Sequence, residues 1–90
     1  MAGKMSLRNI DIMEPSKEEA KFILSLLDEE SRKYPKTIHV VVQEYHPNAG
    51  CNTRIRTIDV ARDLYNQREH APYVSWFATR EYYEKIVGDT

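Results

Sequence analysis

The chain has 90 residues, which is the size of one small domain and excludes a second. Its composition, 41% hydrophobic and 30% charged, is typical of a folded globular protein and argues against disorder. Thirteen Lys and Arg against fourteen Asp and Glu leave a net charge of −1, without the basic excess of most nucleic-acid binders. We expect one domain over residues 1–90, with residues 1–6 frayed.

The sequence also predicts a location. No apolar run approaches the roughly 20 residues of a membrane span, and the start of the chain lacks the apolar stretch of a signal peptide. The lone Cys51 cannot form an internal disulfide. Together these features predict a cytoplasmic protein with no membrane contact.

The first predicted elements are a strand and a helix. Apolar and polar residues alternate over residues 7–13, which favours a short edge strand. Ser16 and Glu19 form a capping-box pattern, and apolar residues then follow at helical spacing until Pro35 ends the pattern. These signals predict a helix over residues 16–34.

The next segment, residues 37–45, holds the densest run of β-branched residues in the chain and predicts the central strand of a sheet. One face of this strand would carry Ile38, Val40 and Val42, whereas the other would carry a mixture of polar and apolar side chains. We expect the apolar face to pack on the helix over residues 16–34.

A loop and a second strand-helix pair follow. Residues 46–52 are rich in Pro, Asn and Gly, which predicts a loop, and its length suggests a functional surface. Alternation resumes in residues 53–57, so a hairpin with the central strand is expected. Thr57 is placed to cap a second helix over residues 58–69.

The last third has two interpretations. Residues 73–78 form either an aromatic strand, followed by a helix capped by Thr79, or the first turns of one helix over residues 73–87. With the strand, the element order predicts an α+β fold. Its sheet would have three to four mainly antiparallel strands, with about three helices packed on one side.

The residues capable of metal or nucleophilic chemistry are few. His46, Cys51 and His70 lack the paired short spacings of zinc sites. A reactive Cys51 would need a nearby base and a cation, and no family signature surrounds it. We therefore predict no metal, no cofactor and no catalytic residue, with a small metal- or Cys-dependent enzyme as an alternative.

A second alternative is a DNA-binding transcriptional regulator that uses the strand-helix segment of residues 53–69. Arg54 and Arg56 lie two apart and point the same way from a strand. If residues 73–87 form one helix, the order strand, helix, helix resembles a ribbon-helix-helix DNA-binding arrangement. Phosphate contacts need only a local basic patch, so nucleic acid is the less favoured partner rather than an excluded one.

Aromatic side chains are concentrated near the end of the chain, with five in residues 73–83. A core of this size cannot bury every ring, and exposed Tyr, Trp and Arg are typical of protein-protein hot spots. The chain is therefore predicted to be a small non-catalytic protein-binding module, a regulator or inhibitor of a larger protein partner, either alone or as a homodimer. The predicted partner-binding residues are Tyr45, Asn48, Arg54, Arg56, Arg62, Tyr73, Trp76, Arg80 and Tyr82.

Overall fold

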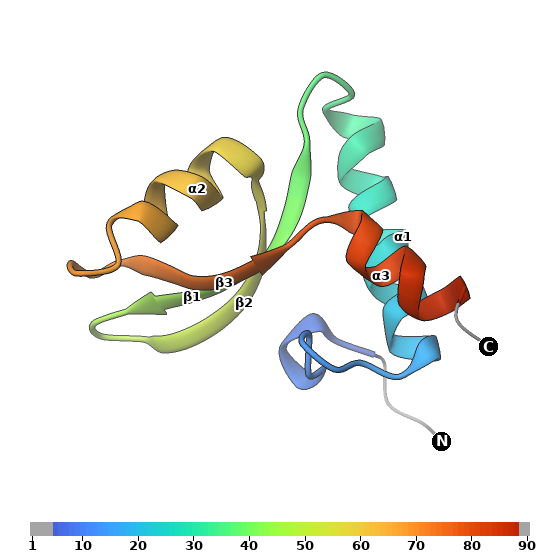
Figure 1. Cartoon of the computed structure of the whole chain (residues 1–90), viewed down its shortest axis with the longest axis horizontal. Coiled ribbons are helices and arrows are strands. Elements are labelled where there is room, and N and C mark those ends of the chain that lie inside the picture. Colours follow the sequence, from blue (N-terminus) through green and yellow to red (C-terminus); the bar gives the residue numbers. More distant parts are fainter. Residues whose placement is uncertain (1–4, 89–90) are drawn as a thin grey trace.

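The computed structural model describes residues 5–88, which form a three-stranded antiparallel sheet with helices on both faces (Figure 1). The strand order is β2-β1-β3. Within the described residues, no helix is long and apolar enough to cross a bilayer. The α+β class is confirmed, and residues 73–78 are a strand. The elements are η1 (Leu7–Asn9), α1 (Lys17–Lys33), β1 (His39–His46), β2 (Gly50–Thr57), α2 (Ile58–Asn66), β3 (Tyr73–Ala78) and α3 (Arg80–Gly88).

Helix α1 begins at the predicted capping box. The Ser16 hydroxyl accepts a hydrogen bond from the Glu19 amide at 3.1 Å, and the Glu19 carboxylate accepts one from the Ser16 amide at 2.9 Å. Ala20, Ile23 and Leu27 then form a buried stripe at helical spacing. The predicted helix is confirmed because both its cap and its apolar face are present.

Strands β1 and β2 form the expected hairpin. Their register pairs His39 with Thr57 and His46 with Gly50, so the connection is only residues 47–49 and is shorter than the predicted loop. Gly50 has a φ of 72°, in the left-handed region that glycine adopts without strain. At the other end, the Thr57 hydroxyl accepts a hydrogen bond from the Val60 amide and caps α2, as predicted.

The helices do not share one side of the sheet, contrary to expectation. Val41 packs with α1 and α3, whereas Val40 and Val42 pack with α2 on the opposite face. The predicted packing of Val40 and Val42 on α1 is therefore wrong. The reason is topological: β2 and β3 are the two edges of the sheet, so the connection through α2 crosses one face of β1 and covers it.

Residues 7–13 form no strand, which corrects that prediction. The Asp11 carboxylate accepts hydrogen bonds from the amides two and three residues ahead, at 3.1 and 3.2 Å, and this turn competes with extended pairing. Ile10 and Ile12 are nevertheless buried in the core shared with α1 and α3, so the alternation marked burial correctly. Of the six residues expected to be frayed, residues 1–4 lie outside the described part of the chain.

Candidate functional site: an aromatic strip on the sheet

Four of the predicted partner-binding residues lie together on the sheet face that also carries α1 and α3. Tyr45 and Tyr73 occupy paired positions on β1 and β3, and their ring centroids are 5.2 Å apart. Trp76 and Tyr82 meet edge to face, with centroids 5.7 Å apart. We call these four residues the aromatic strip. Asn48 lies beyond Tyr45, exposed in the hairpin turn.

The strip depends on a β-bulge in β3. Tyr73 and Trp76 are three residues apart, and on a regular strand they would point to opposite faces. Two successive residues of β1 lie opposite Trp76 and Val74, so Ser75 between them is an extra residue. The bulge therefore turns Tyr73 back to the face of Trp76.

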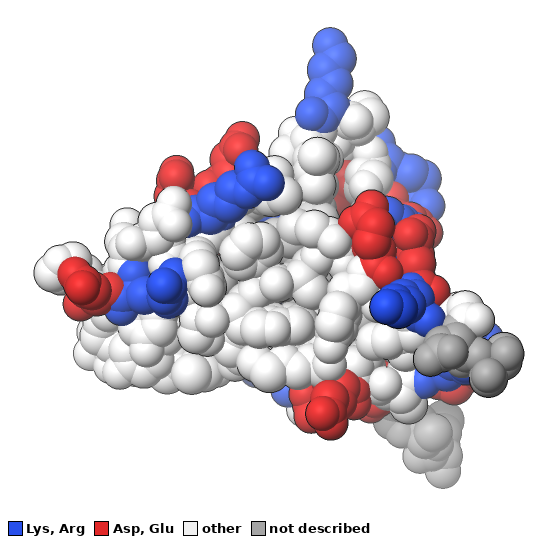
Figure 2. Space-filling model, in the orientation of Figure 1, with Lys and Arg blue, Asp and Glu red and all other residues white. Residues whose placement is uncertain are grey.

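The part of the strip that lies on the sheet has uncharged neighbours. Strand β3 contains no Lys, Arg, Asp or Glu, and the neighbours of Tyr45 on the same face of β1 and β2 are Gln43, Thr53 and Cys51. Figure 2 shows a broad uncharged area over β3 and the β1-β2 hairpin, with charged residues at its margins on the helices, the α2-β3 connection and the N-terminal segment. Aromatic enrichment with few charges is typical of the core of a protein interface.

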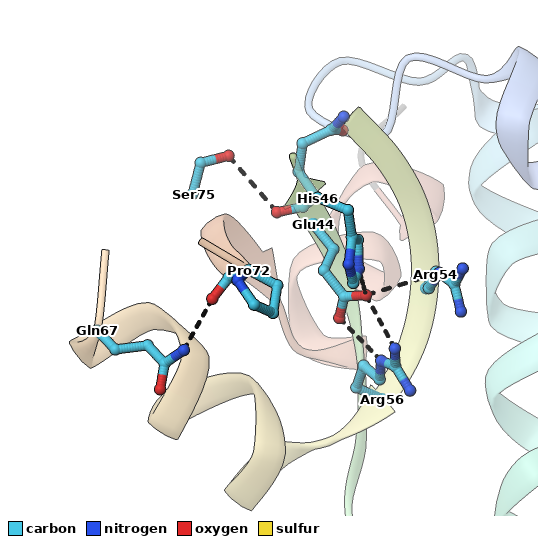
Figure 3. A network of polar contacts seen from close by, with 8 residues as sticks. Glu44, His46, Arg54, Arg56, Gln67, Pro72 and Ser75 are labelled. Carbon is cyan, nitrogen blue, oxygen red and sulfur yellow. Dashed lines mark hydrogen bonds and ion pairs between the residues drawn. The ribbon is translucent and has the colours of Figure 1, made fainter. Parts of the chain in front are cut away.

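The opposite face of the sheet holds a charged cluster centred on Glu44 of β1 (Figure 3). Glu44 is fully buried, and Arg56 donates to both of its carboxylate oxygens, at 2.9 and 2.8 Å. His46 Nε2 lies 2.6 Å from one of these oxygens, and Arg54 Nε lies 3.6 Å from it. The cluster joins β1 to β2 across the hairpin.

The Glu44 carboxylate is unsuited to proton transfer near neutral pH. The hydrogen bonds from Arg56 lower the pKa of Glu44 from 4.5 to about 2; His46 acts in the same direction, and burial opposes both. Glu44 in turn raises the pKa of Arg56. A carboxylate that stays ionised down to about pH 2 is a poor general acid or base, so the geometry supports a structural ion pair.

The arginines that were predicted to complete the aromatic surface lie elsewhere. Arg54 and Arg56 are held by Glu44 on the opposite face, and Arg62 is exposed on α2, which covers that face. Arg80 contacts the Asp28 carboxylate of α1 at 2.7 Å and so ties α3 to α1. The structure therefore separates the aromatic and arginine parts of the predicted site.

His46, Cys51 and His70 do not converge on one face of the sheet. His46 lies opposite Gly50 and Cys51 lies opposite Tyr45 in the hairpin, so their side chains point to different faces. His70 is exposed in the connection between α2 and β3. Residues 5–88 contain no group of three or more His, Cys, Asp or Glu side chains able to hold a metal ion.

The environment of His39 could not be predicted from the sequence. This residue is only 8% exposed, and within the described part of the chain its Nδ1 has no hydrogen-bond partner. Two open clefts of about 300 Å³ adjoin it, one between the end of α1 and the end of β2, the other beside the start of α3. Glu30 and Arg56 place opposite charges in the first cleft.

The observed strand β3 excludes the ribbon-helix-helix arrangement, which required a single helix over residues 73–87. That interpretation was open because six residues cannot separate the two periodicities. Comparisons of the chain with protein-family models, curated proteins and solved structures gave no match.

Proposed function

We propose that the protein is a small protein-binding module that contacts a larger cytoplasmic partner through the aromatic strip. The observation that supports this proposal is the gathering of Tyr45, Tyr73 and Trp76 on one face of the sheet, where Tyr82 of α3 packs on Trp76. Tyr and Trp are the residue types most enriched in interface hot spots. Such a module regulates or inhibits its partner by occupying a surface and needs no catalytic group, metal or cofactor.

The strip is held in place before any partner arrives. Strand pairing fixes Tyr45 beside Tyr73, and the Tyr82 hydroxyl donates a hydrogen bond to the Met13 carbonyl of the N-terminal segment. Tyr82 also packs edge to face on both Trp76 and the buried Tyr83. Rings that are already ordered lose little conformational freedom on binding, which favours affinity.

The test is partner capture with matched tyrosine variants. The purified protein is incubated with lysate from its own source and analysed by size-exclusion chromatography with light scattering and mass spectrometry. We expect co-elution with one larger protein, and about 30-fold weaker binding to it after Tyr45→Ser and Tyr73→Ser together, the effect of losing about 2 kcal/mol. Tyr34→Ser is the control because Tyr34 is 57% exposed and lies just beyond α1.

Two results would contradict the proposal. One is a partner retained at full affinity by the folded double variant. The other is a protein that captures only nucleic acid; this would favour the DNA-binding alternative, which predicts loss of binding with rising salt and on mutation of Arg54 and Arg56.

A further inference from the structure

His39 is a buried side chain whose hydrogen-bonding capacity is not fully used within the described part of the chain. Only 8% of the residue is exposed, and its Nδ1 atom has no partner among residues 5–88. Most buried nitrogen atoms in proteins are paired, because an unpaired one loses its contacts with water and gains none in exchange. His39 lines both clefts at this end of the sheet, so a ligand held in either cleft lies beside it.

The cleft between the end of α1 and the end of β2 has the composition of a small-molecule site. Ile55 and Val60 form an apolar part of its lining, and Thr37 and Thr57 add polar residues. Its volume of about 300 Å³ is at the lower end of the usual range for ligand sites. Apolar walls with a few polar groups are typical of sites that bind small molecules. The cleft therefore fits a small ligand with an apolar body.

The charged group of this cleft that is available to a ligand is negative. Arg56 lines the cleft, but its Nε and Nη2 atoms already donate to the Glu44 carboxylate, at 2.9 and 2.8 Å. Glu30 of α1 also lines it, and within residues 5–88 its carboxylate pairs only with the Lys33 Nζ, at 3.7 Å. The Lys33 side chain is 56% exposed, and ion pairs at the surface contribute little. Glu30 can therefore exchange Lys33 for a positively charged ligand.

We propose that this cleft binds a small primary amine with an apolar body. An ammonium group has three N–H donors and no acceptor, whereas the Glu30 carboxylate and a neutral His39 imidazole both accept hydrogen bonds. The apolar body would cover Ile55 and Val60 and remove their surface from water. A carboxylate ligand is disfavoured because it would meet Glu30 while Arg56 is held by Glu44.

This site is separate from the aromatic strip. His39 and Tyr45 are six residues apart on the same face of β1, which places them roughly 20 Å apart along the strand. The amine site therefore goes beyond the proposed partner-binding surface and does not depend on it. Tyr45→Ser together with Tyr73→Ser should leave amine binding unchanged.

The test uses phenethylamine as the probe and nuclear magnetic resonance of the full chain at about pH 8, where an ordinary histidine is neutral. The chain has three histidines, so spectra of His46→Gln and His70→Gln identify the imidazole signals of His39. We expect a saturable shift of the His39 signals, with an affinity in roughly the millimolar range for a ligand of this size. Phenethyl alcohol and hydrocinnamate have a similar apolar body without the positive charge, and they should bind at least about tenfold more weakly.

Two neighbouring glutamates on α1 provide matched variants. Glu30→Gln should weaken phenethylamine binding about tenfold, because the charged acceptor is lost. Glu29→Gln is the control: Glu29 pairs with the same Lys33, also at 3.7 Å, but does not line the cleft. Three results would overturn the inference: no saturable shift of the His39 signals, equal affinity for hydrocinnamate or phenethyl alcohol, or unchanged affinity of the folded Glu30→Gln variant.

Discussion

The two faces of the sheet differ in the charged side chains that they carry. On the α2 face, Val40, Val42 and Glu44 are all fully buried, and the Glu44 carboxylate is neutralised within the protein by basic side chains. On the α1 and α3 face, Val41 is buried in the main core and Tyr45 lies in an uncharged row of half-buried side chains. Strand β1 thus contributes Glu44 to an internal ion-pair cluster on one face and Tyr45 to a partly exposed aromatic surface on the other.

Charged residues in the sequence therefore do not locate a site by themselves. Arginines drew attention in the sequence, yet Arg56 and Arg80 are committed to carboxylates within the protein. A guanidinium that already pairs with a carboxylate inside the protein must lose that pair to bind a ligand, so it binds more weakly than its charge suggests. The aromatic rings on the other face take part in no ion pair, so they are the better candidates for partner recognition.

The greatest loss of stability should come from breaking the charged cluster around Glu44. Glu44→Gln leaves Arg56 next to a buried amide, and we expect it to lower the free energy of unfolding by about 2–4 kcal/mol, at the lower end for buried pairs because Arg56 is partly solvated. Chemical denaturation measures this change. Glu29→Gln is the control: Glu29 belongs to an exposed ion pair on α1, and its loss should cost less than about 0.5 kcal/mol. Equal costs for the two variants would contradict the structural role of Glu44.

Low pH should remove the contribution of the Glu44 carboxylate to the free energy of unfolding without any mutation. Because the folded protein holds the pKa of Glu44 at about 2, below its ordinary value of 4.5, the stabilisation is complete above pH 4.5 and disappears as the pH falls towards 2. The stability difference between wild type and Glu44→Gln should be constant from pH 7 to 5 and shrink below that. A difference that stays constant to pH 2 would show that Glu44 acts through packing alone.

A smaller effect is expected on the other face. Tyr83 is fully buried, its pKa is raised by burial, and its hydroxyl donates to the Ile12 carbonyl at 2.9 Å. Tyr83→Phe should cost about 1–2 kcal/mol of stability because the carbonyl is left without its donor. Tyr82→Phe is the matched control, since the adjacent hydroxyl lies at the surface and its carbonyl partner can bind water. A larger loss in the control would contradict this assignment of the core.

The smallest effect concerns the strip itself. A double-mutant cycle on Tyr45 and Tyr73 should give a coupling of only about 0.5–1 kcal/mol, the usual value for a cross-strand aromatic pair. Partner binding should change far more than stability in the same variants. A coupling above about 2 kcal/mol would indicate that the two rings are structural and would weaken their assignment to recognition.

The sequence predicted the parts of the fold that local chemistry decides. The capping box at Ser16, the β-branched run of β1 and the Thr57 cap each specify their own element through short-range contacts. The placement of α2 could not be predicted because it depends on which edges β2 and β3 occupy. The strand prediction for residues 7–13 was wrong because buried and exposed residues can alternate in a turn as well as in a strand. Here the turn is stabilised by hydrogen bonds to Asp11.

The candidate site could be anticipated only as far as residue types allow. Composition singled out Tyr45, Tyr73, Trp76 and Tyr82, but it could not tell which rings would share a face. The Glu44 cluster was missed, although the sequence held a signal: a hairpin that pairs residue 46 with residue 50 brings Arg54 and Arg56 to the face of Glu44. The signal is usable only when the register is known, and a shift of one residue would reverse it.

The bulge at Ser75 has a consequence for how this protein tolerates insertions and deletions. Ser75 is an extra residue in β3, so odd-numbered residues before it and even-numbered residues after it point to the same face of the sheet. Removing this single small residue would restore a regular strand in which Trp76, Val74 and Tyr73 keep their present partners on β1. Tyr73 would stay in the strip, and Val74 would stay in the core beneath α2. A residue inserted between Tyr73 and Val74 would instead turn Tyr73 to the opposite face, so β3 should tolerate a deletion at Ser75 better than an insertion beside it.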